Sequence, residues 1–377
     1  MKAVLRSIAA LAVALLVVVP AHAQIETAAR EAYLIDATTG TVLLDKNGDR
    51  AMPPASMSKI MTAYAVFDRI RQGRLSLEDK LPVSERAWRM GGSKMFVELG
   101  NEIRVEDLLR GVIVQSGNDA CVVLAEGLSG SEEAFARELN SLAAEIGLRD
   151  SHFRNATGWP AEGHVMSARD LALLAQRMIE DFPEFYSYYS ETEFTWHDIT
   201  QSNRNPLLYR NIGADGLKTG HTEEAGYGLT ASAVQDGRRL ILVVTGLESQ
   251  RQRAEEAERL MRWGFREFDN FKLFEAGSVI EEAEVWLGTQ ARIPLVAPKD
   301  VLVTLRHADR DHLSASVIYE GPLAAPIEEG EPLATLKIEA PGIAGQEVTL
   351  VAGASIEEAG HLGRIYQKAR YLLFERE

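Results

Sequence analysis

The segment that most constrains this fold begins with two prolines and continues as an apolar run, from Pro53 to about Arg71. Proline suits the turn before a helix but not its interior, so the sequence predicts a helix starting near Ser56. The residues after Lys59 are apolar on nearly every face of that helix. A helix of this kind is buried, and the remaining chain must supply the layers that cover it.

Ser56 and Lys59 are three residues apart, which places both on the same face of a helix. A lysine at the start of a buried helix is poorly solvated, and desolvation disfavours its charged form. A neutral amine beside a serine hydroxyl can take the hydroxyl proton, and a helix N-terminus favours negative charge at the serine oxygen. The pair is therefore a candidate nucleophile and base. A helix cap followed by a solvated lysine is the alternative interpretation.

Length, charge and cysteine content limit the class of protein. The chain has 377 residues, of which 46% are hydrophobic and 25% charged, so it can bury a large core in two or more domains and is not mainly disordered. A net charge of −15 argues against a nucleic-acid partner. The single cysteine, Cys121, excludes an intramolecular disulfide and is interpreted as a small core residue.

The N-terminus has the pattern of an export signal. A positively charged start is followed by the apolar run Ile8–Val19 and by an A-x-A cleavage pattern at residues 21–23. We therefore predict a cleaved signal peptide over residues 1–23, with the mature chain starting at Gln24. An uncleaved membrane anchor is the alternative.

Strand patterns open and close the next part of the chain, and helical patterns lie between them. A β-hairpin is predicted over about 33–44, helices over about 75–178, a second hairpin over 228–246, and a charged helix over about 250–268. The simplest architecture for residues 24–270 is one sheet built from both ends, carrying a mostly helical insertion. The predicted fold class is α/β (α+β).

The composition shifts near Asn270. Six of the 13 prolines fall between Pro294 and Pro341, which argues against a long helix there. Short β-type runs separated by turns predict a small all-β sandwich over residues 271–353. No cluster of titratable residues at catalytic spacing occurs in it, so we assign it no chemistry.

The last segment, residues 354–377, has the pattern of an amphipathic helix. Leu362 and Ile365 fall on its apolar face, and Arg364 and Lys368 fall on the opposite face. In an exported protein, this pattern indicates a helix lying in a membrane interface. The alternative is a helix packed on its own protein.

Two further short motifs carry candidate chemistry. Ser116-Gly117-Asn118 lies between two predicted helices, in a tight loop that would present its side chains; helix capping is the structural alternative. Lys218-Thr219-Gly220 lies just before the closing strands. A cation, a hydroxyl and a glycine that lets a ligand approach the backbone make a carboxylate-binding edge, and a turn with an exposed lysine is the alternative.

Ser-x-x-Lys, Ser-x-Asn and Lys-Thr-Gly each occur once, in this order. With the surroundings of the last two motifs, residues 115–121 and 215–222, they give the chain a resemblance to the low-molecular-weight penicillin-binding proteins, specifically the D-alanyl-D-alanine carboxypeptidases. The resemblance covers nearly the whole chain, including the signal peptide, the β-domain and the terminal helix. It implies a serine β-lactamase/DD-peptidase-like catalytic domain.

The resemblance also implies roles for the reacting groups. Ser56 would attack the carbonyl between two terminal D-alanines and form an acyl-enzyme, and Lys59 would be the base. Ser116 would pass a proton towards the leaving D-alanine, and Asn118 would hold the substrate amide. The backbone N–H groups of Ser56 and His221 would form the oxyanion hole.

The same resemblance indicates which residues would bind the terminal carboxylate of the substrate. Lys218 and Thr219 would bind the terminal carboxylate, with Gly220 leaving room at the strand edge. Arg204 and Arg253 match arginines near the substrate site of the family. No cofactor and no metal are expected, and the eight histidines include no His-Glu-x-x-His.

The resemblance implies partners and a location as well. The expected substrate is a peptidoglycan stem peptide ending in D-Ala-D-Ala, cut during peptidoglycan maturation and cell-shape control, and β-lactams would be covalent inhibitors. The protein would be periplasmic, peripheral on the outer face of the cytoplasmic membrane, with the terminal helix contacting that inner-membrane surface.

Three alternative functions can be weighed against the same sequence. A class A β-lactamase uses a glutamate base in a Glu-x-x-x-Asn pattern, and no asparagine here has a glutamate four residues earlier, so a long-lived penicillin adduct is expected instead. Transpeptidase or endopeptidase activity would differ only in the acceptor or the bond chosen, and the sequence leaves both open. A non-catalytic envelope scaffold would be favoured by a missing motif residue, but none is missing.

Overall fold

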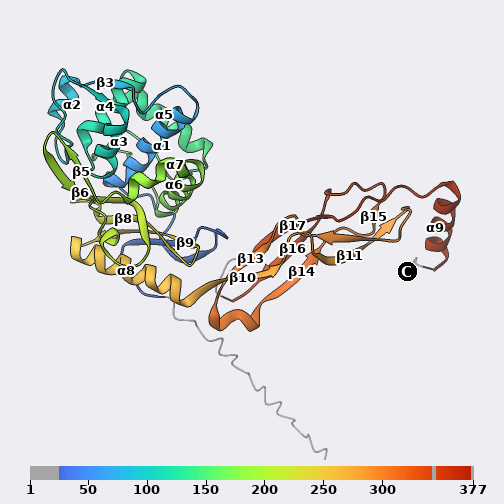
Figure 1. The fold of residues 1–377 in the computed structure, drawn as a ribbon. Helices are drawn as coiled ribbons and strands as arrows, with labels where there is room; N and C mark the ends of the chain where they lie inside the picture. Colours follow the sequence, from blue (N-terminus) through green and yellow to red (C-terminus); the bar gives the residue numbers. More distant parts are fainter. Residues whose placement is uncertain (1–24, 342–344, 375–377) are drawn as a thin grey trace, which may run out of the picture.

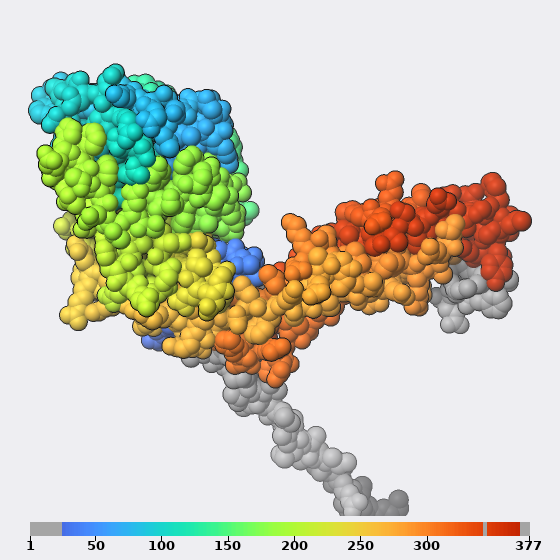
Figure 2. Space-filling model, viewed as in Figure 1, coloured from blue at the N-terminus to red at the C-terminus, as the bar shows by residue number. Residues whose placement is uncertain are grey.

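The computed structural model describes residues 25–341 and 345–374. The predicted signal peptide, residues 1–23, lies outside the described residues, as do residues 375–377 of the predicted terminal helix. A large N-terminal lobe is followed by an elongated β-rich lobe that extends to one side of it (Figure 2). Among the described residues, no helix is long and apolar enough to cross a membrane.

The N-terminal lobe is built on a five-stranded antiparallel sheet with the strand order β2-β1-β9-β8-β7. Its strands come from both ends of this part of the chain: β1 (Glu31–Asp36), β2 (Val42–Lys46), β7 (Ala214–Thr222), β8 (Gly226–Gln235) and β9 (Arg238–Leu247). This confirms the predicted mixed fold with one sheet and a helical insertion. Strand β7 lies at the edge of the sheet, so one side of it pairs with no other strand of the described residues.

Helices cover both faces of this sheet (Figure 1). Alternate residues of β1 enter different cores: Tyr33 and Ile35 pack with the helical insertion, whereas Ala32 and Leu34 pack with α8 (Gln250–Glu267). The helices of the insertion are α1 (Lys59–Arg71), α2 (Glu85–Arg89), α3 (Val105–Ile113), α4 (Asn118–Ser129), α5 (Glu132–Glu145), α6 (Ala168–Asp181) and α7 (Pro183–Tyr186). A strand covered on both faces is apolar where it is buried, and the middle four residues of β1, 32–35, are apolar.

Helix α1 lies at the centre of the insertion. It contacts α3, α4, α5 and α6, and it is buried from Lys59 to Asp68, which confirms the prediction of a buried central helix. The α-helix begins at Lys59, a turn later than predicted, because Ser56 lies in the 3₁₀ turn η1 (Ala55–Ser58). Residues three apart eclipse in a 3₁₀ turn, so the change of helix type keeps Ser56 in line with Lys59.

Short elements complete the N-terminal lobe. They are the hairpin of β3 (Lys80–Pro82) and β4 (Glu102–Arg104), the hairpin of β5 (Glu193–Trp196) and β6 (Ile199–Ser202), and the 3₁₀ turns η2 (Ser187–Ser190) and η3 (Pro206–Tyr209).

The second lobe is all-β, as predicted. Its two sheets have the orders β10-β13 and β14-β16-β17-β12-β11-β15, and they share one apolar core. The strands are β10 (Phe268–Phe274), β11 (Val279–Trp286), β12 (Arg292–Val296), β13 (Val301–Arg306), β14 (Ser314–Ile318), β15 (Leu323–Ala324), β16 (Pro332–Glu339) and β17 (Gln346–Ala352), with the 3₁₀ turn η4 (His307–His312). Helix α9 (His361–Phe374) follows at the end of this lobe that lies farthest from the N-terminal lobe (Figure 1).

A buried ion pair lies where the two lobes meet. The Asp36 carboxylate accepts a hydrogen bond from Arg238 Nε at 2.6 Å, and Arg238 Nη1 donates to the carbonyl of Phe268, the first residue of β10, at 2.5 Å. Close by, Thr39 Oγ1 lies 2.5 Å from Thr304 Oγ1 of β13. The pair therefore fixes the start of the second lobe to the sheet of the first.

Arg238→Met should lower the free energy of unfolding by about 3 kcal/mol, because it leaves the fully buried Asp36 carboxylate without its cation. The matched control is Arg251→Met on α8, whose ion pair with Glu255 is 86% and 56% exposed, so its loss should leave the free energy of unfolding nearly unchanged. Urea unfolding measures both. Equal losses in the two variants would contradict the assignment of the pair as a lobe junction.

Candidate active site

Ser56 and Lys59 form a hydrogen-bonded pair at the start of α1. Lys59 Nζ lies 2.9 Å from Ser56 Oγ and 2.6 Å from the carbonyl oxygen of Thr157. Lys59 is 1% exposed, so its amine has protein partners in place of water. A neutral amine can donate one hydrogen to the Thr157 carbonyl and turn its lone pair towards the Ser56 hydroxyl, which is the geometry of a general base.

The surroundings of Lys59 favour the neutral amine. Burial is the main cause that lowers the pKa of Lys59 from 10.5 to about 8, and the positive charge of Arg204 contributes to this decrease. The negative charges of Asp119 and Glu132 raise the pKa of Lys59 and so partly offset this decrease. With a pKa of about 8, roughly a tenth of the amine is uncharged at pH 7, and this neutral fraction can act as the base next to Ser56.

Ser116 lies in the loop between α3 and α4. Its backbone has a left-handed φ of 62°, it is 1% exposed, and its Oγ has no hydrogen-bond partner among the described residues. Asn118 begins α4, and its Nδ2 donates to the carbonyl of Gly91 at 2.9 Å. Helix α4 contacts α1, the helix that begins with Lys59, and the charge of Asp119 raises the pKa of Lys59. A buried hydroxyl without a protein partner is available to a bound ligand or water.

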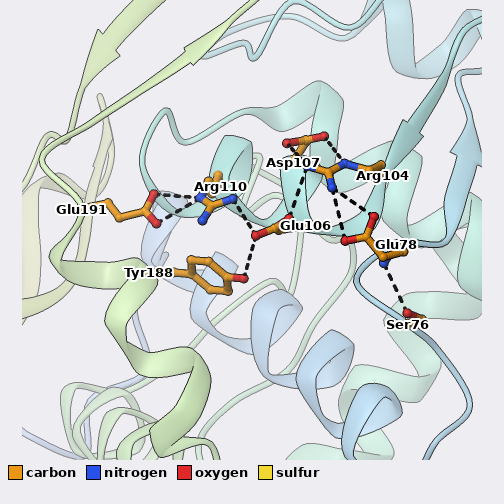
Figure 3. Close-up of polar contacts among 8 residues, drawn as sticks. All are labelled: Ser76, Glu78, Arg104, Glu106, Asp107, Arg110, Tyr188 and Glu191. Atoms are coloured by element: carbon orange, nitrogen blue, oxygen red, sulfur yellow. Dashed lines mark hydrogen bonds and ion pairs between the residues drawn. The ribbon is translucent and has the colours of Figure 1, made fainter.

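A network of charged side chains holds the helix that leads to Ser116 (Figure 3). Arg110 of α3 donates from Nε to both carboxylate oxygens of Glu191, at 3.0 and 3.1 Å, and from Nη1 to Glu106 at 2.8 Å. Its guanidinium also lies 4.8 Å from the ring centroid of Tyr188. The network joins α3 to the segment between η2 and β5. Its members are partly exposed, so each pair contributes modestly.

The third motif lies on edge strand β7, packed against the turn that carries Ser56. Lys218 and Thr219 are buried. A Cβ atom built on Gly220 would lie 2.9 Å from the carbonyl oxygen of Pro54 and 3.2 Å from Cβ of Ala55. Only glycine allows so close an approach between β7 and the turn. The structure therefore brings Lys218, Thr219 and Gly220 beside Ser56.

The basic side chains that the sequence predicts for the site are Lys59, Lys218, Arg204 and Arg253, and the other three lie within electrostatic range of Lys218. The charges of Lys59, Arg204 and Arg253 all lower the pKa of Lys218, although burial is the largest cause. Within residues 25–341 and 345–374, no carboxylate forms an ion pair with any of the four. Arg253 is buried with its Nε unpaired, and burial lowers its pKa to about 10. Three of the four, Lys59, Lys218 and Arg253, are buried, and buried cations without carboxylate partners make a site for an anionic ligand.

His221 follows Gly220 on the same strand. Its side chain is exposed and stacks on Tyr227, with ring centroids 3.9 Å apart, and the guanidinium of Arg253 lies 5.8 Å from the Tyr227 ring. His221 thus lies at the solvent side of the cation cluster. The predicted oxyanion-hole role of its backbone N–H, with that of Ser56, stays a prediction.

Sequence reasoning missed two supporting groups. The first is the loop 155–164, which supplies the carbonyl of Thr157; Asn155 Oδ1 accepts the N–H of Gly158 in this loop at 2.8 Å. The second is the carboxylate of Asp119, which accepts backbone N–H groups of the loop at 95–97 at 2.8 to 3.1 Å. A backbone carbonyl leaves no motif in a sequence. An asparagine two residues before a threonine was the available signal, because it is typical of an Asx turn.

Two family models match this chain. One, described as D-alanyl-D-alanine carboxypeptidase, matches residues 18–249, and the other, described as the C-terminal domain of penicillin-binding protein 5, matches residues 268–358. The chain is 38% identical over 346 residues to the D-alanyl-D-alanine carboxypeptidase DacC of Escherichia coli (strain K12), covering 90% of this chain and 86% of the relative.

Solved structures are similar as well. Penicillin-binding protein 5 from Haemophilus influenzae aligns with a TM-score of 0.81 at 36% identity, over 89% of this chain and 99% of that one. Penicillin-binding protein D2 from Listeria monocytogenes, in its ampicillin-bound form, aligns with a TM-score of 0.59 at 31% identity, over 64% of this chain and 99% of that one.

Gly158→Ala should destabilise the protein through a direct backbone clash. Gly158 has a φ of +75°, and a Cβ there would lie 1.9 Å from the carbonyl oxygen of Ala55. The matched control is Gly130→Ala, with a φ of +77° and no atom within 4 Å of the added Cβ. Because both variants carry the cost of a left-handed alanine, the excess loss in the Gly158 variant, about 2 kcal/mol in urea unfolding, measures the clash. Equal losses would show that the loop at Gly158 is not closely packed against the turn at Ala55.

Proposed function

Because this chain belongs to the D-alanyl-D-alanine carboxypeptidase family, we propose that Ser56 is its nucleophile and Lys59 the base that activates it. The protein is a serine-type D-alanyl-D-alanine carboxypeptidase, a penicillin-binding hydrolase of peptidoglycan maturation. The observation that carries the residue assignment is the buried amine of Lys59, 2.9 Å from Ser56 Oγ and 2.6 Å from the Thr157 carbonyl.

In the proposed acylation, Ser56 Oγ attacks the carbonyl carbon between the last two D-alanines while Lys59 Nζ takes the hydroxyl proton. The negative charge that develops on the carbonyl oxygen is stabilised by the N–H groups of Ser56 and His221. The C–N bond then breaks, and Lys59 gives up its proton through the Ser116 hydroxyl to the nitrogen of the departing D-alanine. The buried Ser116 hydroxyl is free for this transfer, because it has no partner among the described residues. The remaining peptide is held as an ester on Ser56.

In the proposed hydrolysis, a water molecule attacks the ester carbon and gives its proton to Lys59. The ester bond to Ser56 breaks, Oγ regains a proton from the lysine, and the shortened peptide leaves. The same amine thus acts as base and then as acid in each half of the reaction.

The substrate position follows from the edge strand and the cations. An extended peptide can add to the free side of β7. We assign its terminal carboxylate to Lys218, Thr219, Arg204 and Arg253, because the buried Lys218 and Arg253 and the exposed Arg204 have no carboxylate partner within the described chain. The side chain of Asn118 would hold the peptide amide. The substrate class is the peptidoglycan stem pentapeptide.

Purified mature protein should release D-alanine from a peptide ending in D-Ala-D-Ala and should take up one labelled penicillin on Ser56. Ser56→Ala should abolish both, because no other hydroxyl pairs with Lys59 Nζ in the described structure. The matched control is Ser141→Ala on the exposed side of α5, which should change neither. D-alanine release or labelling by the Ser56 variant would show that another residue is the nucleophile.

The rate of penicillin acylation should depend on pH through the amine of Lys59. The neutral amine is the active form, and it becomes the major form above the pKa of about 8. The second-order acylation rate should therefore rise about tenfold per pH unit well below that pKa and level off above it. Stopped-flow or quench measurements give the profile. A rate that stays flat below about pH 8 would contradict a lysine base.

We propose that α9 holds the protein on the outer face of the cytoplasmic membrane, in the periplasm. Leu362, Ile365 and Tyr366 of this helix are 84%, 64% and 69% exposed, an unusual exposure for three large apolar side chains on one element. The helix lies beyond the β-lobe, away from the N-terminal lobe (Figure 1). This arrangement supports a membrane-bound end with the catalytic site held at a distance.

Replacing Leu362 and Ile365 by serine should move the protein from the membrane pellet to the soluble fraction, because it removes the apolar area that enters the interface. Deleting residues 360–377 should do the same. Leu99→Ser, which changes a leucine that is 52% exposed on the N-terminal lobe, is the control and should leave the partition unchanged. An unchanged partition in both the double-serine variant and the deletion variant would reject the membrane anchor.

A further inference from the structure

A buried histidine outside the sequence motifs contacts the turn that carries Ser56. His164 is 3% exposed, and its Nε2 atom lies 2.9 Å from the hydroxyl oxygen of Ser58. Ser58 is itself fully buried and is the residue directly before Lys59. The contact therefore reaches the backbone that carries the base.

The hydrogen bonds of the ring fix its tautomer. His164 Nδ1 accepts the backbone N–H of Arg154 at 3.3 Å, so the ring proton is on Nε2 and is donated to Ser58 Oγ. Burial lowers the pKa of His164 to about 4, and the charges of His152, Lys59 and Arg154 act in the same direction. The ring stays neutral at physiological pH, and the hydrogen bond persists.

His164 closes a loop that contacts the same turn at its other end. There, Thr157 accepts the hydrogen bond from Lys59 Nζ at 2.6 Å, and Gly158 packs against the carbonyl of Ala55. A neutral amine has one lone pair, and its direction is set by where its hydrogens are donated. The direction of the Lys59 lone pair thus depends on how the loop carbonyl lies relative to the turn.

We propose that His164 is a positioning residue: its hydrogen bond to Ser58 fixes the turn against the loop 155–164, so that the Lys59 amine stays aligned with Ser56 in both acylation and hydrolysis. The proposal rests on the proposed function of Ser56 and Lys59. It adds a residue that touches neither substrate nor the reacting atoms. Misplacement by about 1 Å can lower a rate by about 100-fold, so one such bond can matter to turnover.

Three single variants test the proposal. His164→Leu keeps a similar volume but removes the donor, Ser58→Ala removes only the acceptor oxygen, and His164→Gln offers an N–H near the position of Nε2. We expect His164→Leu and Ser58→Ala to lower kcat about tenfold to about 100-fold, with KM for the D-Ala-D-Ala peptide changed by no more than about twofold. His164→Gln should keep kcat within about threefold of the parent.

The double variant and a count of the active enzyme distinguish an effect on the position of Lys59 from an effect on folding. If the bond carries the effect, Ser58→Ala with His164→Leu should be no slower than the slower single variant, because the shared bond is already lost. Penicillin stoichiometry counts the folded, acylatable enzyme, and kcat is expressed per labelled site. Ser58→Ala keeps the test valid should the leucine variant fail to fold.

Two outcomes would overturn the proposal. One is a kcat per labelled site within about twofold of the parent for both His164→Leu and Ser58→Ala. The other is His164→Gln losing as much kcat as His164→Leu, which would mean that the ring shape matters and the donor does not. Either result would leave Ser56 as the labelled nucleophile, whereas failure of the proposed function would appear as continued activity of Ser56→Ala.

Discussion

The structure depends on the burial of one lysine amine beside one serine hydroxyl. Taking an ammonium out of water is costly, so a buried lysine either becomes neutral or finds partners. Both effects act on Lys59: its pKa is lowered to about 8, which makes the neutral form accessible, and the Thr157 carbonyl lies 2.6 Å from its Nζ. The fold must therefore bring an acceptor, a hydroxyl and an apolar cover to the first turn of α1, and each layer contributes to that requirement.

The sheet and the helical insertion form opposite walls around this point. The edge strand β7 brings Lys218 against the turn because Gly220 leaves no Cβ in the way. The insertion brings Ser116 on the loop between α3 and α4. None of the residues that we assign to the site lies in the β-lobe or α9, and the Asp36–Arg238 pair ties that lobe to the sheet. In this proposal the N-terminal lobe carries out the reaction, and α9 at the end of the β-lobe holds the enzyme at the membrane.

Sequence patterns predicted the features that rest on side-chain type and spacing. The buried helix at Lys59, the sheet built from both ends and the all-β second lobe follow from hydrophobic periodicity and turn residues, and the structure confirms them. The 3₁₀ turn at Ser56 could not be predicted, because left-handed residues such as Ala55 leave no pattern. The loop that includes His164 offered only the Asx-turn signal of Asn155, and the carbonyl that it supplies leaves no motif. The roles of the site residues and the domain limits stay predictions.

The account rests most directly on the charge state of Lys59, and NMR can measure it. Lysines labelled with ¹³C at the ε-carbon would be titrated in the intact protein, with Lys59→Arg identifying the signal. We expect the Lys59 signal to titrate near pH 8, well below the ordinary lysine value of 10.5. A Lys59 signal that titrates at 10.5 or above would show a permanently charged ammonium and would contradict its role as the base for Ser56.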